Sequence, residues 1–178
     1  MHACLHVNEI LRLIASEVVA SKGKATAVAL ACCCKSFEDP VLDALWETQD
    51  QLAVLLKTFP KDVWNKGKRT VSVPASYAAS SLKCFIRKLG RLPTTLELAC
   101  FRKYARRMRK LGDFWTLNAL HSEVFLILQR FSFNEPLLPN LKTLHLPRTN
   151  AEVAPFLLLF VSPATTIISI GFQTPYPP

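Results

Sequence analysis

Three consecutive cysteines are the residues of this chain best suited by type to do chemistry. Cys32, Cys33 and Cys34 are half of the six cysteines in 178 residues. A zinc site needs pairs two to four residues apart, with a second pair elsewhere, and neighbouring helical positions point about 100° apart. The triplet fits neither requirement, and cysteine is among the residue types most often buried. We predict that these thiols fill a core and alkylate slowly, and that the chain holds no metal.

A basic segment, residues 82–111, is the second candidate for chemistry. It contains ten lysines and arginines and one acid, Glu97, in a chain of net charge +9. Helical spacing over residues 95–110 gathers Leu98, Phe101, Ala105 and Met108 on one side and leaves the cations around the rest. Such a face is either solvated or contacts an acidic partner or nucleic-acid phosphates. The candidate contacts are Arg102, Lys103, Arg106, Arg107 and Lys110.

Catalytic motifs are missing from the sequence. It has no G-x-S-x-G and no H-E-x-x-H, and its four histidines are isolated from one another. Residues 21–26, SKGKAT, lack the leading glycine and the hydroxyl directly after the lysine that a phosphate loop needs. We therefore expect no enzyme, no catalytic residue and no cofactor.

The first third of the chain predicts short helices that would have to position the cysteines. Apolar residues recur at spacings of three and four from Val7 to Val18, and Gly23 should end this helix. A second helix, residues 26–34, is apolar nearly all round and should be buried on several sides. A third follows with Pro40 in its opening turn. A fourth, residues 51–58, should turn Leu52, Leu55 and Leu56 inward.

The last third changes to a repeating leucine pattern. Leu144 and Leu146 end an L-x-x-L-x-x-L-x-L run, and Ile168 and Ile170 repeat its ending 24 positions later. This period is typical of leucine-rich repeats, which place one strand and one return helix in each unit. Residues 153–172 carry no charge, but prolines and hydroxyls interrupt them, so we favour short buried elements over a membrane span.

Composition narrows the class of protein further. Half of the residues are hydrophobic and the mean hydropathy is +0.20, which excludes wholesale disorder. Glu9, Arg12 and Glu17 interrupt the N-terminal apolar pattern, so we expect no signal peptide. Three adjacent and three scattered cysteines do not form a disulfide framework. Reduced thiols in the cytoplasm or nucleus are the expected state.

The first fifty residues resemble an F-box. The resemblance rests on VNEIL at 7–11, on LACCCKSF at 30–37, and on Pro40, Leu42, Leu45 and Trp46. The whole chain is similar to fungal F-box proteins that carry FEDPVLDxLW, then a YARRxRxL segment, then degenerate leucine-rich repeats. Residues 104–111, YARRMRKL, and residues 139–144, PNLKTL, match that layout.

The resemblance implies a substrate receptor of an SCF-type cullin-RING ubiquitin ligase. An F-box docks on a Skp-type adaptor, and the C-terminal repeats hold an unknown protein target. The implied adaptor-binding residues are Val7, Glu9, Ile10, Ile14, Leu30, Cys33, Phe37, Pro40, Leu42, Leu45 and Trp46. Two alternatives stay open: a basic nucleic-acid-binding module centred on residues 102–110, and a truncated, vestigial F-box protein without a target.

The expected fold is mainly α with a small α/β part. A three-helix F-box occupies residues 5–50, and a helical or irregular connector occupies residues 51–94. A short, incomplete leucine-rich-repeat-like solenoid follows over residues 95–172, and residues 173–178 form an unpacked tail.

Overall fold

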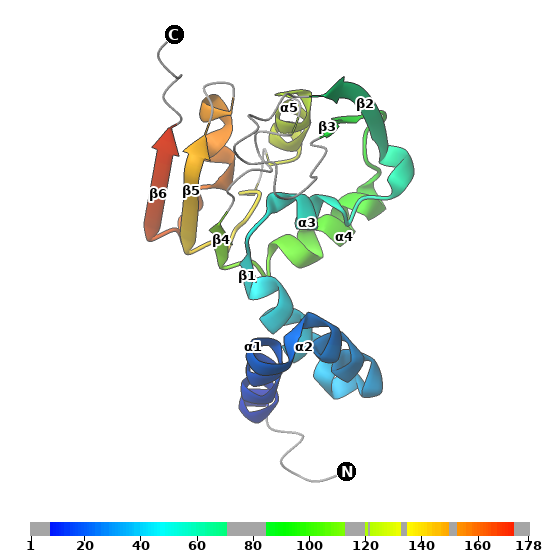
Figure 1. Ribbon diagram of the computed structural model, residues 1–178, viewed down its shortest axis with the longest axis vertical. Helices are drawn as coiled ribbons and strands as arrows, with labels where there is room; N and C mark the ends of the chain where they lie inside the picture. The colour runs from blue at the N-terminus through cyan, green and yellow to red at the C-terminus, as the bar shows by residue number, and fades with distance from the viewer. Residues whose placement is uncertain are drawn as a thin grey trace.

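The chain folds into two bodies that meet where its first short strand begins (Figure 1). A computed structural model describes residues 8–70, 85–112, 120, 122–132, 135–149 and 153–172. The fold is mainly helical with one small parallel sheet, in agreement with the expected class. Val7 and the expected tail at 173–178 lie outside the described residues. None of the helices in the described part combines the length and apolar character that crossing a bilayer requires.

The smaller body consists of α1 (Asn8–Cys33) and α2 (Lys35–Glu47). Gly23 breaks α1 into two helical segments with φ 83° and ψ 170°, a backbone conformation that residues with a Cβ rarely adopt. The predicted break at Gly23 is therefore confirmed, and the body contains three helical segments. Its core is small. Ala15, Ala27 and Val41 form its buried cluster, and two of these three side chains are single methyl groups. Leu11 of α1 is also buried.

The third helical segment begins earlier than predicted. Pro40 lies in the interior of α2, so the expectation that it occupies the opening turn is wrong. The helix starts at Lys35 because the Phe37 N–H donates to the Cys34 carbonyl at 2.9 Å, closing a tight first turn ahead of the proline. Cys34 itself is the extended N-cap residue of α2.

The prediction that the cysteines fill a core is also wrong. Cys32 and Cys33 are exposed, and Cys34 is partly exposed. Within the second segment of α1 only Ala27 is buried, so this nearly all-apolar helix uses one narrow stripe for packing. The rest of its apolar surface faces solvent. Hydrogen bonds with Ser36 lower the pKa of the Cys34 thiol below its ordinary value.

The larger body is built on a four-stranded parallel sheet, ordered β1-β4-β5-β6. Its strands are β1 (Thr48–Gln49), β4 (Lys110–Gly112), β5 (Thr143–Thr149) and β6 (Ile167–Phe172). Leu144 pairs with Ile168, and Leu146 with Ile170. The strands predicted at the two ends of the 24-residue spacing are therefore present, and the structure shows that they pair in this register. The segment that returns the chain between them is the 3₁₀ helix η5 (Ala154–Phe160), not an α-helix.

Helices and a hairpin-like pair of strands complete this body (Figure 1). They are α3 (Leu52–Leu56), the 3₁₀ helix η2 (Lys61–Val63), β2 (Trp64–Thr70) paired antiparallel with β3 (Phe85–Leu89), α4 (Thr95–Ala105) and α5 (Ser122–Phe131). One core joins Leu52, Leu55 and Leu56 of α3, as predicted, to Phe101, Phe125 and Phe160. Residues 52–63 and Leu89, which fall in the stretch expected as a connector, therefore contribute to the same core as β5 and η5.

The basic helix α4 is shorter than its sequence pattern. Thr94 caps it in a capping box with Glu97, and Phe101, Ala105 and Met108 are buried as predicted. It ends at Ala105, five residues before the predicted end at Lys110. Lys110 instead starts β4, which pairs with β5 on one side and β1 on the other. At Lys110, pairing with the two neighbouring strands replaces the continuation of the helix that the sequence pattern predicted.

A network of ion pairs at the start of α4 makes the free energy of unfolding depend on pH. Arg91 Nη2 lies 2.6 Å from Asp62 and 2.7 Å from Glu97. The hydrogen bonds from Arg91 and from the Thr94 N–H lower the pKa of Glu97 from 4.5 to about 2. A carboxyl group whose pKa is lower in the folded state than in the unfolded state stabilises the fold fully at pH values above the unfolded-state pKa. That contribution is lost as pH falls from 4.5 towards 2.

We therefore expect Glu97→Gln to be less stable than the wild type at pH 7 and equal to it near pH 2. Urea midpoints measured across that range check the prediction. Glu9→Gln, at an exposed position of α1, is the matched control and should follow the wild-type pH profile. A Glu97→Gln curve parallel to the wild type throughout would rule out the Arg91 network as the cause.

Candidate functional site

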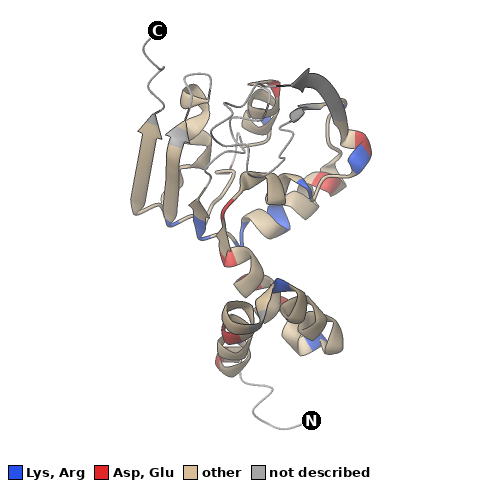
Figure 2. Cartoon of the chain, in the orientation of Figure 1, with Lys and Arg blue, Asp and Glu red and all other residues tan. Residues whose placement is uncertain are grey.

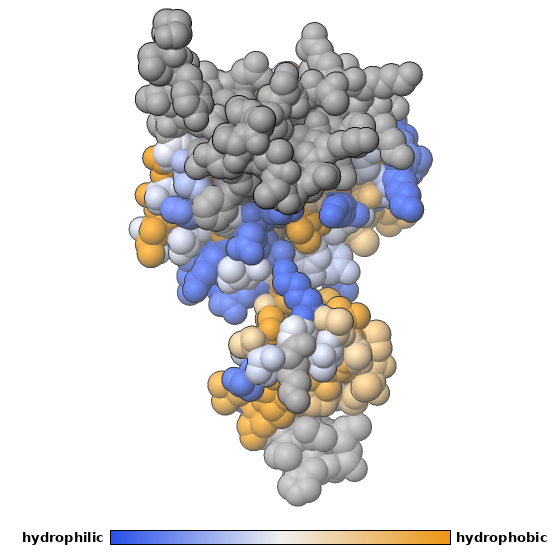
Figure 3. All heavy atoms as spheres, viewed as in Figure 1, coloured by the Kyte–Doolittle hydropathy of each residue, from blue (hydrophilic) through white to orange (hydrophobic). Residues whose placement is uncertain are grey.

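Large apolar side chains stand exposed on the smaller body. Ile10 is 36% exposed, Leu13 71% and Val28 51%. Figure 3 shows hydrophobic residues gathered over this body and hydrophilic residues where the two bodies meet. Leu13 and Val28 were not among the residues implied by the F-box resemblance. Leu13 falls outside the apolar spacing of the first helix, which could have marked it as exposed. The second helical segment is apolar nearly all round, so its pattern gave no signal that Val28 is exposed.

The predicted adaptor-binding residues divide by exposure. Glu9, Ile10 and Cys33 are exposed, and Ile14 and Leu42 are partly buried. Leu30, Phe37 and Leu45 are partly buried against the small core, and Pro40 is buried. Exposed and buried residues alike lie within the three helical segments of the smaller body. The exposed ones remain available for contact with another protein.

Trp46 occupies the connection between the two bodies. Its ring stacks on Tyr104 of α4, with centroids 4.7 Å apart and planes at 30°. It is partly buried and packs against the core of the larger body. One face of the ring is therefore already covered by this chain, and Trp46 holds α2 to α4.

An arginine reinforces this connection. Arg107 follows α4, and its guanidinium Nη2 lies 2.5 Å from Asp39 Oδ1 while Nη1 pairs with Asp43. Nη1 also donates to the Asp39 carbonyl at 3.2 Å. The side chain of Arg107 is 14% exposed, so both α2 carboxylates reach a largely desolvated partner. The sequence indicated Arg107 as a candidate contact to an acidic partner or nucleic acid, and in the structure it forms ion pairs with two carboxylates of its own chain.

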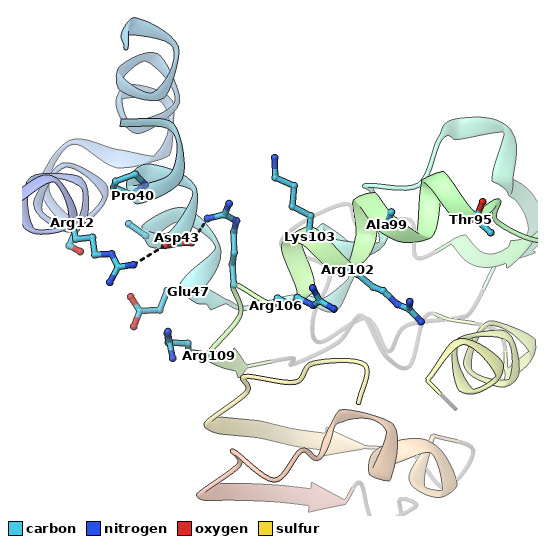
Figure 4. A pocket seen from close by; sticks show the side chains of 13 residues that line it. Arg12, Pro40, Asp43, Glu47, Thr95, Ala99, Arg102, Lys103, Arg106 and Arg109 are labelled. Carbon is cyan, nitrogen blue, oxygen red and sulfur yellow. Dashed lines mark hydrogen bonds and ion pairs between the residues drawn. The ribbon is translucent and has the colours of Figure 1, made fainter. Parts of the chain in front are cut away.

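A cleft of about 700 Å³ lies beside this ion pair, between the two bodies (Figure 4). Cations from both bodies line it, and Figure 2 shows the acidic and basic residues that meet at the junction. Of the five predicted contacts, four line the cleft, and Lys110 lies in β4 instead. Arg12 was missed because it lies on a different element from the basic helix. Arg109 belongs to the basic segment but was not among the five predicted contacts. The lining residues are Arg12, Ser16, Pro40, Asp43, Ala44, Glu47, Thr95, Ala99, Arg102, Lys103, Arg106, Arg107 and Arg109.

Two features of these residues bear on what they could bind. Among the described residues, no three His, Cys, Asp or Glu side chains lie together as a metal ion would require. The exposed side chains of Ile10, Leu13 and Val28 form an apolar face on the smaller body. Contact with another protein would remove this face from water, and the cations of the cleft can bind a negatively charged group. In comparisons of sequence and fold, no protein-family model, curated protein or solved structure matched the chain.

Proposed function

We propose that the chain is a substrate receptor of an SCF-type ubiquitin ligase. The smaller body docks on a Skp-type adaptor, and the larger body holds the target protein. The observation that carries this proposal is the exposure of Leu13 and Val28 on a body that buries few apolar side chains. Among its described residues these are Leu11, Ala15, Ala27, Pro40 and Val41. The F-box resemblance of residues 7–46 identifies the kind of partner that would cover them.

The energetics favour a partner for this body. Fully burying a large apolar side chain contributes about 1.5–3 kcal/mol relative to leaving it in water. Leu13 and Val28 keep more than half of their surface exposed, so most of that free energy is still unused. Cys32 and Cys33, exposed on the same helical segment as Val28, extend the surface that a partner helix could cover.

The connection between the bodies supports the receptor role. A ligase receptor acts by raising the concentration of its target near the ubiquitin-loaded enzyme, and a rigid link makes this more effective than a flexible one. The Trp46–Tyr104 stack and the Arg107 ion pairs provide a link of this kind. A target on the larger body would then stay at a fixed distance from the adaptor.

The decisive experiment is complex formation between the purified chain and a Skp-type adaptor. We expect a stoichiometric complex in size-exclusion chromatography. Leu13→Asp with Val28→Asp should weaken it about 30-fold, since about 2 kcal/mol of apolar burial is lost. The matched control is Leu96→Asp with Leu158→Asp, because these leucines are each 81% exposed but belong to the larger body. Its affinity should stay within about twofold of the wild type.

Thiol alkylation provides a footprint in the same experiment. Cys32, Cys33 and Cys100 are all exposed, so all three should label readily in the free chain. Adaptor binding should protect Cys32 and Cys33 and leave Cys100 of α4 reactive. Failure of the wild-type chain to bind the adaptor would refute the proposal. Binding without any target captured from the native host would support the vestigial alternative over the receptor.

A further inference from the structure

We propose that the cleft between the two bodies binds an acidic segment of peptide. Of the residues implied in adaptor binding, Pro40 alone also lines this cleft, and the proposal does not depend on adaptor docking. Its walls come from both bodies. Arg12 lies on the α1 wall, and Arg102, Lys103 and Arg106 lie on the α4 wall (Figure 4).

The pattern of α4 explains how one helix can form a wall of this kind. Phe101 and Ala105 are buried in the core of the larger body. Thr95, Ala99 and Arg106 follow each other at helical spacings on the face that lines the cleft. The side chains of Thr95 and Ala99 are short, so they leave room in the cleft near the start of the helix. Longer cationic side chains occupy the rest of this wall.

Charge favours an anionic occupant. Six cations and two carboxylates, Asp43 and Glu47, line the cleft. Arg106 is paired with Glu135 at 3.1 Å, and Arg107 with two aspartates. Lys103 and Arg109 are exposed and have no acidic partner within 4.0 Å among the described residues. Cations outnumber carboxylates even when Asp39 and Glu135 are included. Arg12 lies 3.8 Å from Asp43, and Arg102 donates to the Phe131 carbonyl. Lys103 and Arg109 are therefore the cations that a ligand can engage without breaking one of these contacts.

The detailed lining favours peptide over nucleic acid. None of the lining residues is aromatic, so the described cleft offers no ring on which bases could stack. Asp43 and Glu47 would repel a continuous phosphate backbone, but their oxygens can accept hydrogen bonds from peptide N–H groups. A peptide supplies both kinds of group, carboxylates for the cations and N–H donors for the two acids.

Fluorescence anisotropy with three labelled probes tests the proposal. The probes are an alternating Glu-Gly peptide, an alternating Gln-Gly peptide of the same length, and a single-stranded oligothymidylate of the same formal charge as the first. We expect the Glu-Gly peptide to bind most tightly and the Gln-Gly peptide at least tenfold more weakly. Because the attraction is electrostatic, affinity should also fall with added salt.

The variant that tests the site is Lys103→Glu with Arg109→Glu, which should lower affinity for the Glu-Gly peptide at least tenfold. Arg130→Glu with Lys142→Glu is the matched control. It makes the same change of net charge at exposed positions outside the cleft, and should change the affinity less than about twofold. Equal losses in both variants would overturn the proposal, as would tighter binding of the oligothymidylate that is abolished by Lys103→Glu with Arg109→Glu. Circular dichroism confirms that each variant is folded.

Discussion

Replacing Gly171 by alanine is expected to detach β6 from β5 and to lower the free energy of unfolding by about 3 kcal/mol. A Cβ at this position would lie 2.3 Å from the Pro147 carbonyl oxygen and 3.0 Å from its carbon. These are backbone atoms of β5, so no side-chain rotation can relieve the contact. The strands would have to separate at the point where their register already shifts, between Leu146 and Thr149.

Gly112→Ala is the matched control for this prediction. Gly112 also lies in a strand of the same sheet, β4, but a Cβ there meets nothing within 4 Å. Its unfolding free energy should stay within about 1 kcal/mol of the wild type. Urea denaturation measures both variants, and hydrogen exchange of the β5 amides locates the damage. Equal stability of the two alanine variants would show that β5 and β6 do not approach each other this closely.

Trp46→Ala should also destabilise the chain by about 3 kcal/mol, at the lower end of the range for removing a buried tryptophan. The ring is only partly buried, but it loses both the stack on Tyr104 and its packing against the larger core. The two bodies should separate as a result, which small-angle scattering would detect as an increase in the radius of gyration. Trp46→Phe should recover much of the loss, because an aromatic ring can still stack on Tyr104.

A double-mutant cycle with Tyr104→Ala isolates the stack. We expect a coupling energy of about 1 kcal/mol between the two rings. Additive losses would mean that the rings contribute only through their separate packing. The cycle also affects how adaptor binding is interpreted. Trp46→Ala can weaken adaptor binding simply because the two bodies separate. Leu13→Asp tests the docking face without touching this stack.

The sequence predicts those elements that carry a regular local pattern. Gly23 interrupts the apolar spacing of α1, and the leucine spacing of 24 predicts the strands that contain Leu144 and Ile168. The strands β1 and β4 were not predicted. They contain two and three residues, and β4 directly follows a helical pattern. No periodicity can be recognised over so short a stretch, and both strands exist because a neighbouring strand pairs with them.

The exposed cysteines show a different limit. An apolar helix predicts that something covers it, but the pattern does not state whether the covering surface belongs to the same chain. In this structure Cys32 and Cys33 face solvent. The inference of burial was sound for residue type and wrong for this chain, because α2 covers only the stripe around Ala27.

Ion pairs between residues far apart in the sequence also cannot be predicted from local sequence patterns. Arg107 belongs by spacing to the cationic side of α4, but its carboxylate partners lie 64 and 68 positions away on α2. Four of the cations predicted as contacts line the cleft, and their role in binding stays a prediction. The division of its cations into those that join the bodies and those that line the cleft required the tertiary structure.

The unequal spacing of the parallel strands affects the order in which the protein can assemble. Paired positions are 24 apart for β5 and β6, 33 apart for β4 and β5, and 62 apart for β1 and β4. The entropy of loop closure makes the last pairing about 0.8 kcal/mol more costly than the first. During synthesis, the helices that end at Glu47 emerge from the ribosome long before residue 110. The N-terminal helices are therefore complete, with their apolar face accessible to a partner, before the strand that anchors them has a neighbour.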